Sequence, residues 1–168
     1  MGRDISSLTV RRGEPAAGRR AQTTVAQSDD TARTPARLWA PGVERGAGLY
    51  IHIPFCETKC PYCDFNTYAG IEALVPEYMA ALRQEIVRWG GLLGRLRVKT
   101  IFFGGGTPSY VPQVEIAAVM GACRQEFTID RGAEVTLEAN PGDVNAEKLS
   151  AWLASGINRL SIGVQSFD

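Results

Sequence analysis

The sequence predicts an α/β protein whose strands run parallel. Short apolar stretches recur between residues 49 and 164, and segments with helical periodicity separate them. Repeated strand–helix–strand units imply right-handed crossovers and therefore parallel strands within one sheet. A doubly wound sheet and part of a barrel both satisfy this pattern, so the pattern alone leaves the choice between them open.

Three of the four predicted strands, the first, third and fourth, carry one apolar face and one polar or small face. The four strands span residues 49–53, 100–103, 134–138 and 159–164. In the third strand, Thr136 and Glu138 face away from the apolar side chains. A parallel sheet covered on both faces would be apolar on both, so the polar face should line a site. Glu138 ends its strand, which is where ligands bind in parallel architectures.

Three helices are expected between these strands, at about residues 74–90, 112–126 and 145–154. In the first of them, Pro76 is suited to the first turn, and the helix is predicted to end at Gly90-Gly91. Its buried face is predicted to carry Tyr78, Leu82, Ile86 and Trp89. Helical spacing also places Cys123 on the buried face of the second helix, which favours a core role for that thiol.

Residues 1–46 differ from the rest in composition. They hold eight arginines against five acidic residues and show no periodic apolar pattern, which predicts a disordered N-terminal extension before an ordered domain over residues 47–168. An organellar transit peptide is the alternative, but acidic residues and the lack of an amphipathic stretch count against it. The start at Gly2 also fits the permissive N-myristoylation pattern.

Composition excludes several classes of protein. A formal net charge of zero argues against a nucleic-acid partner. No apolar run approaches the roughly 20 residues that span a bilayer, so no membrane span is expected. Cysteines gathered in one short window fit a metal site in a reducing compartment better than a disulfide framework, and we predict a cytoplasmic location.

The gathered cysteines are Cys56, Cys60 and Cys63, spaced C-x3-C-x2-C. A closed structural site uses four protein ligands, so three thiolates indicate a metal centre with an open coordination position. A small zinc-binding or thiol–disulfide module is the alternative. His52, inside the first strand, suits hydrogen-bonded support of the cysteine loop better than ligation.

With Gly104-Gly105-Gly106-Thr107-Pro108 after the second strand, the cysteine motif resembles the radical S-adenosylmethionine (SAM) superfamily. The segments beginning at Tyr50, Glu138 and Ser161 are more narrowly similar to the family of oxygen-independent coproporphyrinogen III oxidases and the heme chaperone HemW. The resemblance covers about residues 47–168. It implies the N-terminal part of a radical SAM partial (β/α) barrel, with further strands expected beyond Asp168.

The resemblance also implies cofactors. The three thiolates would hold a [4Fe-4S] cluster, and the amino and carboxylate groups of SAM would chelate the fourth iron. By this resemblance, Gly105, Gly106 and Thr107 would contact the methionine end of SAM, and Glu138 would bind its ammonium. Gln165 would reach the ribose, Tyr62 would contact the adenine, and Tyr50 would lie against one side of the cofactor. The alternatives are a plain turn for the glycine run, a solvated strand end for Glu138 and packing for Tyr50.

Position 65 separates the two branches of the family. The oxidase branch carries a further cysteine two residues after the third, where this chain has Phe65. This favours a HemW-like heme chaperone, with the oxidase as the alternative. The partners implied are SAM, heme or a porphyrin, and an electron donor protein.

Overall fold

The computed structural model describes residues 46–164 of the 168-residue chain. The extension predicted over residues 1–46 therefore lies outside the described residues except for Gly46, and so does Gln165. Within residues 46–164, no helix is long and apolar enough to cross a membrane.

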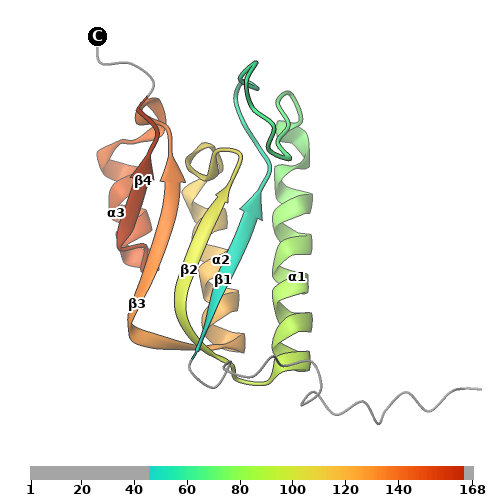
Figure 1. The fold of residues 1–168 in the computed structure, drawn as a ribbon, viewed down its shortest axis with the longest axis vertical. Helices are drawn as coiled ribbons and strands as arrows, with labels where there is room; N and C mark the ends of the chain where they lie inside the picture. Colours follow the sequence, from blue (N-terminus) through green and yellow to red (C-terminus); the bar gives the residue numbers. More distant parts are fainter. Residues whose placement is uncertain (1–45, 165–168) are drawn as a thin grey trace, which may run out of the picture. The chain divides into compact units, whose positions relative to one another are not determined.

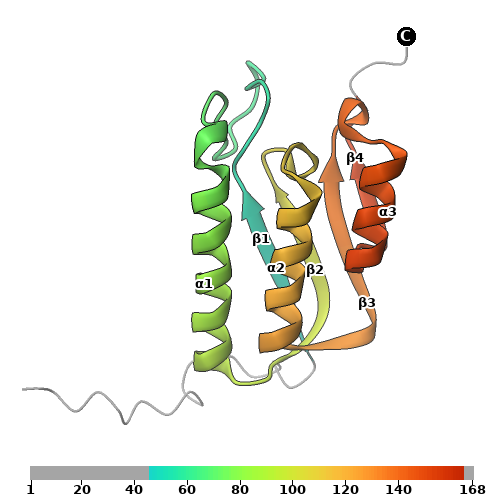
Figure 2. The same ribbon diagram turned by 180° about the vertical axis from the view of Figure 1, so that it is seen from behind.

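The described residues form one parallel sheet with helices packed on a single face (Figures 1 and 2). The strands are β1 (Ala47–Ile53), β2 (Arg97–Gly105), β3 (Thr128–Ala139) and β4 (Arg159–Ile162), hydrogen-bonded in the order β1-β2-β3-β4. The helices are α1 (Val75–Leu93), α2 (Gln113–Glu126) and α3 (Ala146–Ser155), with short 3-10 turns η4 (Glu72–Leu74), η5 (Pro108–Tyr110) and η6 (Pro141–Asp143). A doubly wound sheet carries helices on both faces, whereas a barrel carries them only outside. The described part is therefore a section of (β/α) barrel wall.

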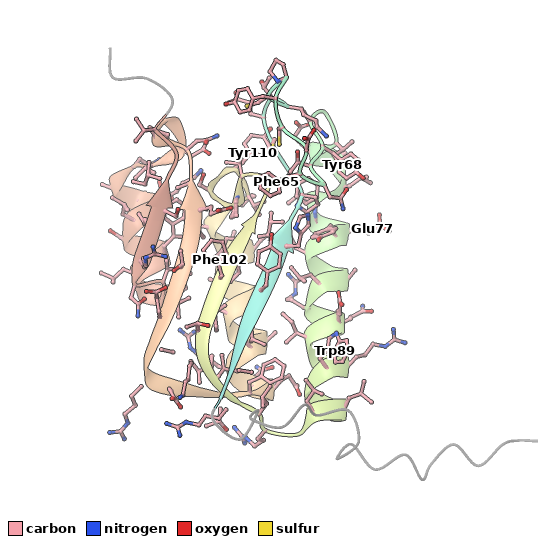
Figure 3. The ribbon with its side chains drawn as sticks, in the orientation of Figure 1. Phe65, Tyr68, Glu77, Trp89, Phe102 and Tyr110 are labelled. Atoms are coloured by element: carbon pink, nitrogen blue, oxygen red, sulfur yellow. The ribbon has the colours of Figure 1, made fainter. Side chains whose placement is uncertain are left out.

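The second face of the sheet is the predicted polar face, and it carries no helix within residues 46–164 (Figure 1). Ile51 and Ile53 of β1 are buried against the helices, while Tyr50, which precedes Ile51, is 62% exposed. Tyr50 stacks on its neighbour Phe102 of β2 at a centroid distance of 6.1 Å, and Figure 3 shows Phe102 on this open face. The alternation predicted for β1 is confirmed.

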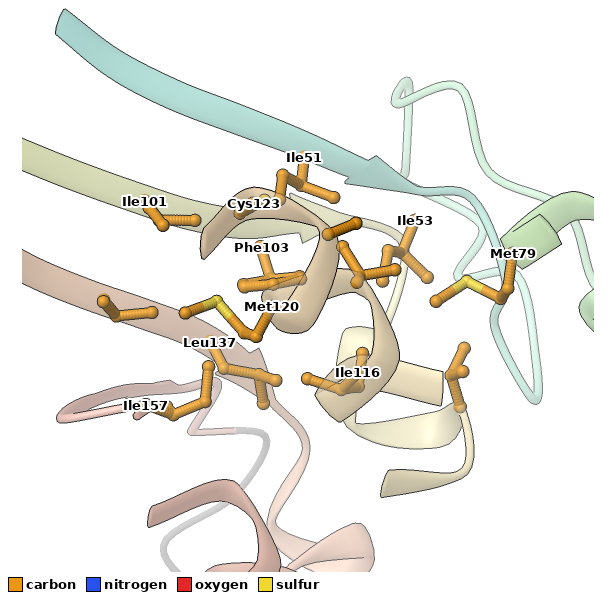
Figure 4. Packing of buried hydrophobic residues seen from close by; sticks show 14 of the residues in the cluster. Ile51, Ile53, Met79, Ile101, Phe103, Ile116, Met120, Cys123, Leu137 and Ile157 are labelled. Atoms are coloured by element: carbon orange, nitrogen blue, oxygen red, sulfur yellow. The ribbon is translucent and has the colours of Figure 1, made fainter. Parts of the chain in front are cut away.

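The core lies between the sheet and the helices (Figure 4). Phe103 and Leu137 from the sheet meet Ile116 and Met120 from α2, and all four are essentially unexposed. Cys123 lies among them with no exposed surface, which confirms its predicted core role. Burial raises the pKa of this thiol to about 12.

The buried thiol of Cys123 should make the folded state less stable at alkaline pH. Once the pH exceeds the ordinary pKa of 9.0, the unfolded chain loses the Cys123 proton while the folded chain keeps it. The folded state then binds more protons, so we expect the free energy of unfolding to fall as the pH rises from 9.0 toward about 12. Urea titrations of the wild type and of Cys123→Ala across this range check it. Equal slopes for the two proteins would contradict it.

Two predictions about helix α1 are wrong. It runs through Gly90-Gly91 to Leu93, and Trp89, expected on its buried face, is 47% exposed. The cause is a close helix contact: a Cβ built on Gly90 would lie 2.6 Å from the Cβ of Glu126 at the end of α2. Gly90 is thus a packing position, and it replaces Trp89 on the buried stripe.

The strand ends also differ from the predicted bounds. β2 and β3 begin earlier than expected, and Arg97 pairs with Asp130 across their amino ends at 2.6 Å. Backbone pairing of Val98, which is buried, with Ile129 extends both strands past the predicted bounds, and the ion pair lies beside it. β4 ends at Ile162, two residues before the predicted Val164.

Candidate functional site

The cysteine loop follows β1 and closes on itself at the carboxyl end of the sheet. The amide of Cys56 donates to the carbonyl of Tyr68 at 2.9 Å, and the amide of Tyr68 donates to the carbonyl of Pro54 at 2.8 Å. Figure 3 shows Tyr68 and Phe65 on this loop, beyond the strand ends. The two ends of the loop are thereby fixed to each other, and the three cysteines lie between them.

Helix α1 anchors the base of the loop. The ring of Phe55 is buried and meets Tyr78 of α1 edge to face at 5.3 Å. The Tyr78 hydroxyl donates to the backbone carbonyl of His52 at 2.8 Å. Aromatic packing and a hydrogen bond therefore hold the end of β1, from which the cysteine loop departs, against a rigid helix.

His52 supports the far side of the loop, as predicted. Its Nε2 lies 2.9 Å from the backbone oxygen of Asn66, and its Nδ1 lies 3.2 Å from the Tyr50 hydroxyl. A carbonyl oxygen only accepts, so Nε2 donates and Nδ1 accepts from Tyr50. Both ring nitrogens are thereby engaged in holding the loop and the sheet together.

The glycine run lets β2 approach the start of the cysteine loop. Gly105 has a φ of 115°, in the region that favours glycine, and a Cβ there would lie 2.6 Å from the His52 ring. The amides of Gly106 and Thr107 donate to the carbonyls of Ile53 and Phe55, both at 2.8 Å. The run therefore joins two segments in addition to making a turn.

Glu138 brings a negative charge to the same place from β3. Its Oε2 accepts a hydrogen bond from the amide of Gly105 at 3.3 Å. Burial, followed by the charge of Glu138, raises the pKa of Tyr50, which keeps that hydroxyl protonated as a donor. A carboxylate beside half-buried glycine backbone is suited to bind a cationic amine.

A cavity of about 610 Å³ gathers most of the predicted site. Its lining includes Cys56, Cys60, Cys63, Tyr62, Gly105, Gly106, Thr107 and Glu138. Tyr50 lies outside the lining, on the open face of the sheet. Thr67 and Asn140 also line the cavity, and neither was predicted as a site residue. The position of Asn140, directly after β3 and two residues after Glu138, was the one available signal.

The donor set fits an iron–sulfur cluster. All three cysteines are free thiols, and the hydroxyls of Thr107 and Thr67 lie 3.6 Å and 3.8 Å from the sulfurs of Cys56 and Cys63. Within residues 46–164, no three His, Cys, Asp or Glu side chains converge closely enough for one metal ion. A [4Fe-4S] cluster needs no such convergence, because each thiolate binds a different iron.

The comparison with protein families decides the assignment. The Radical SAM superfamily model matches residues 50–168. The chain belongs to the radical SAM superfamily. Its section of barrel wall resembles a solved structure described as coproporphyrinogen III oxidase (HemN) from Escherichia coli, a radical SAM enzyme. The TM-score is 0.68 at 35% identity, over 73% of this chain and 29% of that one.

Curated radical SAM relatives include both bacterial and mammalian proteins. The heme chaperone HemW of Escherichia coli is 43% identical over 71% of this chain and 32% of its own length. Radical S-adenosyl methionine domain-containing protein 1, mitochondrial, of Bos taurus is 45% identical over 77% of this chain and 29% of its own length. The chain thus spans about a third of the curated relatives that it matches.

Proposed function

We propose that this radical SAM chain binds a [4Fe-4S] cluster through Cys56, Cys60 and Cys63 and binds SAM at the open iron. The observation that carries the proposal is the single cavity shared by these cysteines, the glycine run and Glu138. Three thiolates leave one iron without a protein ligand, and the adjoining backbone and carboxylate suit an amino acid as its fourth ligand.

The surrounding residues suit the parts of SAM. Gly105, Gly106 and Thr107 would lie along its methionine end, and Glu138 would bind its ammonium. Tyr62 lines the cavity with 78% of its surface exposed, which leaves its ring available to adenine. Gln165 would reach the ribose, and Tyr50 would approach from the open face. When bound, the cluster and SAM supply reductive cleavage of a carbon–sulfur bond, with the electron coming from a donor protein.

For the whole protein we propose heme binding and transfer, as in a HemW-like heme chaperone. Phe65 supports this branch: it lines the cavity, is 71% exposed, and occupies the position where the oxidase branch has its further cysteine. The similarity to HemW of Escherichia coli points the same way. Titration with heme, followed by its absorbance, tests heme binding directly.

Oxygen-independent coproporphyrinogen III oxidase activity is the second candidate, favoured by the likeness to HemN. The two candidates differ in the reaction expected: an oxidase decarboxylates coproporphyrinogen, and a heme chaperone does not. Anaerobic assay with coproporphyrinogen, SAM and reductant separates them. Decarboxylation would reverse the order of the two candidates.

Cluster and SAM binding are tested by anaerobic reconstitution with iron and sulfide. We expect the reduced chain to give a [4Fe-4S] EPR signal that changes when SAM is added, since SAM would bind an iron of the cluster. A signal indifferent to SAM would contradict the SAM site. Zinc in the purified protein without inorganic sulfide would instead favour the small zinc or thiol module.

We also propose a cytoplasmic location, from the grouping of cysteines typical of a reducing compartment. The name of the bovine relative places that protein in mitochondria. Fractionation of cells that express the tagged full chain tests the location. Recovery with mitochondria would overturn the proposal.

A further inference from the structure

Ser109 joins the two loops that follow β2 and β3, next to the proposed SAM contacts. It lies in η5, two residues after Thr107, and its side chain has no exposed surface. Its Oγ donates to Oδ2 of Asp143 at 2.7 Å and accepts the amide of Asn140 at 3.1 Å. The hydroxyl thus uses its proton on one partner and a lone pair on the other, both from the loop that follows β3.

The same serine is tied to helix α3. Its backbone oxygen accepts from Nζ of Lys148 at 2.8 Å. The amide of Lys148 is in turn bound by the side chain of Asn145, which caps the helix at 2.9 Å. Ser109, Asn140, Asp143 and Lys148 therefore form one clasp, in which a buried hydroxyl and a carboxylate are held by an ordered helix.

Such a link is needed because β2 and β3 make few direct contacts beyond their last paired residues, Phe103 and Leu137. Gly105 ends β2 and Glu138 lies one residue before the end of β3, and the hydrogen bond from the Gly105 amide to the Glu138 carboxylate is 3.3 Å long. The other contact, from the Asn140 side chain to the Thr107 hydroxyl, is 3.5 Å. Both are at the weak end for hydrogen bonds, whereas the Ser109–Asp143 bond is short and charge-assisted.

We infer that the clasp of Ser109 and Asp143 is a positioning device that holds the segments beyond the β2–β3 ladder, which carry Thr107 and Glu138, at a fixed distance and so raises the affinity for SAM. The inference rests on the SAM site proposed above. The amino-acid end of SAM would contact both loops at once, so a preset spacing removes the cost of ordering them on binding. Among the described residues, the clasp has no direct hydrogen bond to the three cysteines and reaches Cys56 only through the long contacts of the Thr107 hydroxyl, so we expect cluster assembly to survive its loss.

The test is Ser109→Ala, compared with Ser155→Ala as a matched control. Ser155 is also buried, and its hydroxyl makes a 2.7 Å bond to the Trp152 carbonyl inside α3, away from the SAM loops. Both changes should lower the Tm. Only Ser109→Ala should weaken SAM binding, by about tenfold, the loss expected for one hydrogen bond to a charged group.

Three readouts separate positioning from mere structure. Iron and sulfide content should stay equal in both variants, while the SAM dissociation constant from EPR titration rises only in Ser109→Ala. Hydrogen exchange followed by NMR should show a slow Asn140 amide in the metal-free wild type and a fast one in Ser109→Ala. Asp143→Asn, at a less buried position, keeps an acceptor without its charge and should give a smaller loss of SAM affinity if Ser109→Ala fails to fold.

The outcomes also distinguish this inference from the proposed function. Equal SAM affinity in the wild type, Ser109→Ala and Asp143→Asn would overturn the clasp, and so would a fast-exchanging Asn140 amide in the wild type. A wild-type chain that forms the cluster but ignores SAM would overturn the SAM site and the role of the clasp in SAM affinity together.

Discussion

Alanine in place of Cys60 should abolish the iron–sulfur cluster and leave the fold intact. The Cys60 side chain is half-buried at the cavity and contributes nothing to the apolar core. Its backbone oxygen accepts the amide of Cys63 at 3.0 Å, a bond that alanine keeps. The loop should therefore retain its turn while losing one of three thiolates.

The expected loss is large. Removing an outer contact of a metal ligand already costs about 10–100-fold in metal affinity, so removing a ligand itself should cost more. Iron and sulfide in reconstituted Cys60→Ala should fall to background, and the EPR signal should vanish. The Tm of the metal-free chain should stay close to that of the wild type, because no core contact is lost.

Cys123→Ala is the matched control for this prediction. It removes a thiol from the core instead of the cavity, so it should lower the Tm and leave iron and sulfide per folded chain unchanged. Full iron and sulfide in Cys60→Ala, with an EPR signal that still responds to SAM, would contradict the assignment of Cys60. Loss of the cluster in both variants would point to unfolding as the cause.

The parts of the site that the sequence predicted share one physical basis. The carboxyl ends of parallel strands lie at one edge of the sheet, so the cysteines after β1, the glycine run at the end of β2 and Glu138 on β3 had to meet there. Strand alternation likewise identified the open face. These inferences need only the direction of the strands and the period of the pattern.

The parts that the sequence did not predict depend on partners far along the chain. Gly90 reads as a helix stop until Glu126 of α2 is seen to pack against it. Ser109 and Asp143 are common turn residues, and 34 positions separate them, so neither carries a signal by itself. Such contacts follow from how the helices and loops settle on the sheet, which no local pattern encodes.

Alanine in place of Gly106 should disrupt the site through the backbone. A Cβ there would lie 2.6 Å from the carbonyl oxygen of Phe55 and 2.9 Å from the carbonyl carbon of Pro54. Those atoms belong to the base of the cysteine loop and cannot swing aside as a side chain can. The chain would have to separate, which weakens the bond from the Gly106 amide to Ile53.

The Gly106→Ala variant should lose about 1–3 kcal/mol of unfolding free energy, as overpacked sites do, and should also lose SAM binding. The same Cβ would lie 3.0 Å from the sulfur of Cys56, so cluster content should fall as well. Urea denaturation of the metal-free chain measures the first effect, and iron content with SAM titration by EPR measures the others.

Gly142→Ala in η6 provides the control, because nothing lies within 4 Å of a Cβ built there. It should leave cluster content and SAM affinity at wild-type levels. Normal SAM binding in Gly106→Ala would show that the β2 end and the cysteine loop can part without harm to the site. Their close approach would then serve the packing of the sheet, and the role of the glycine run in SAM binding would have to be abandoned.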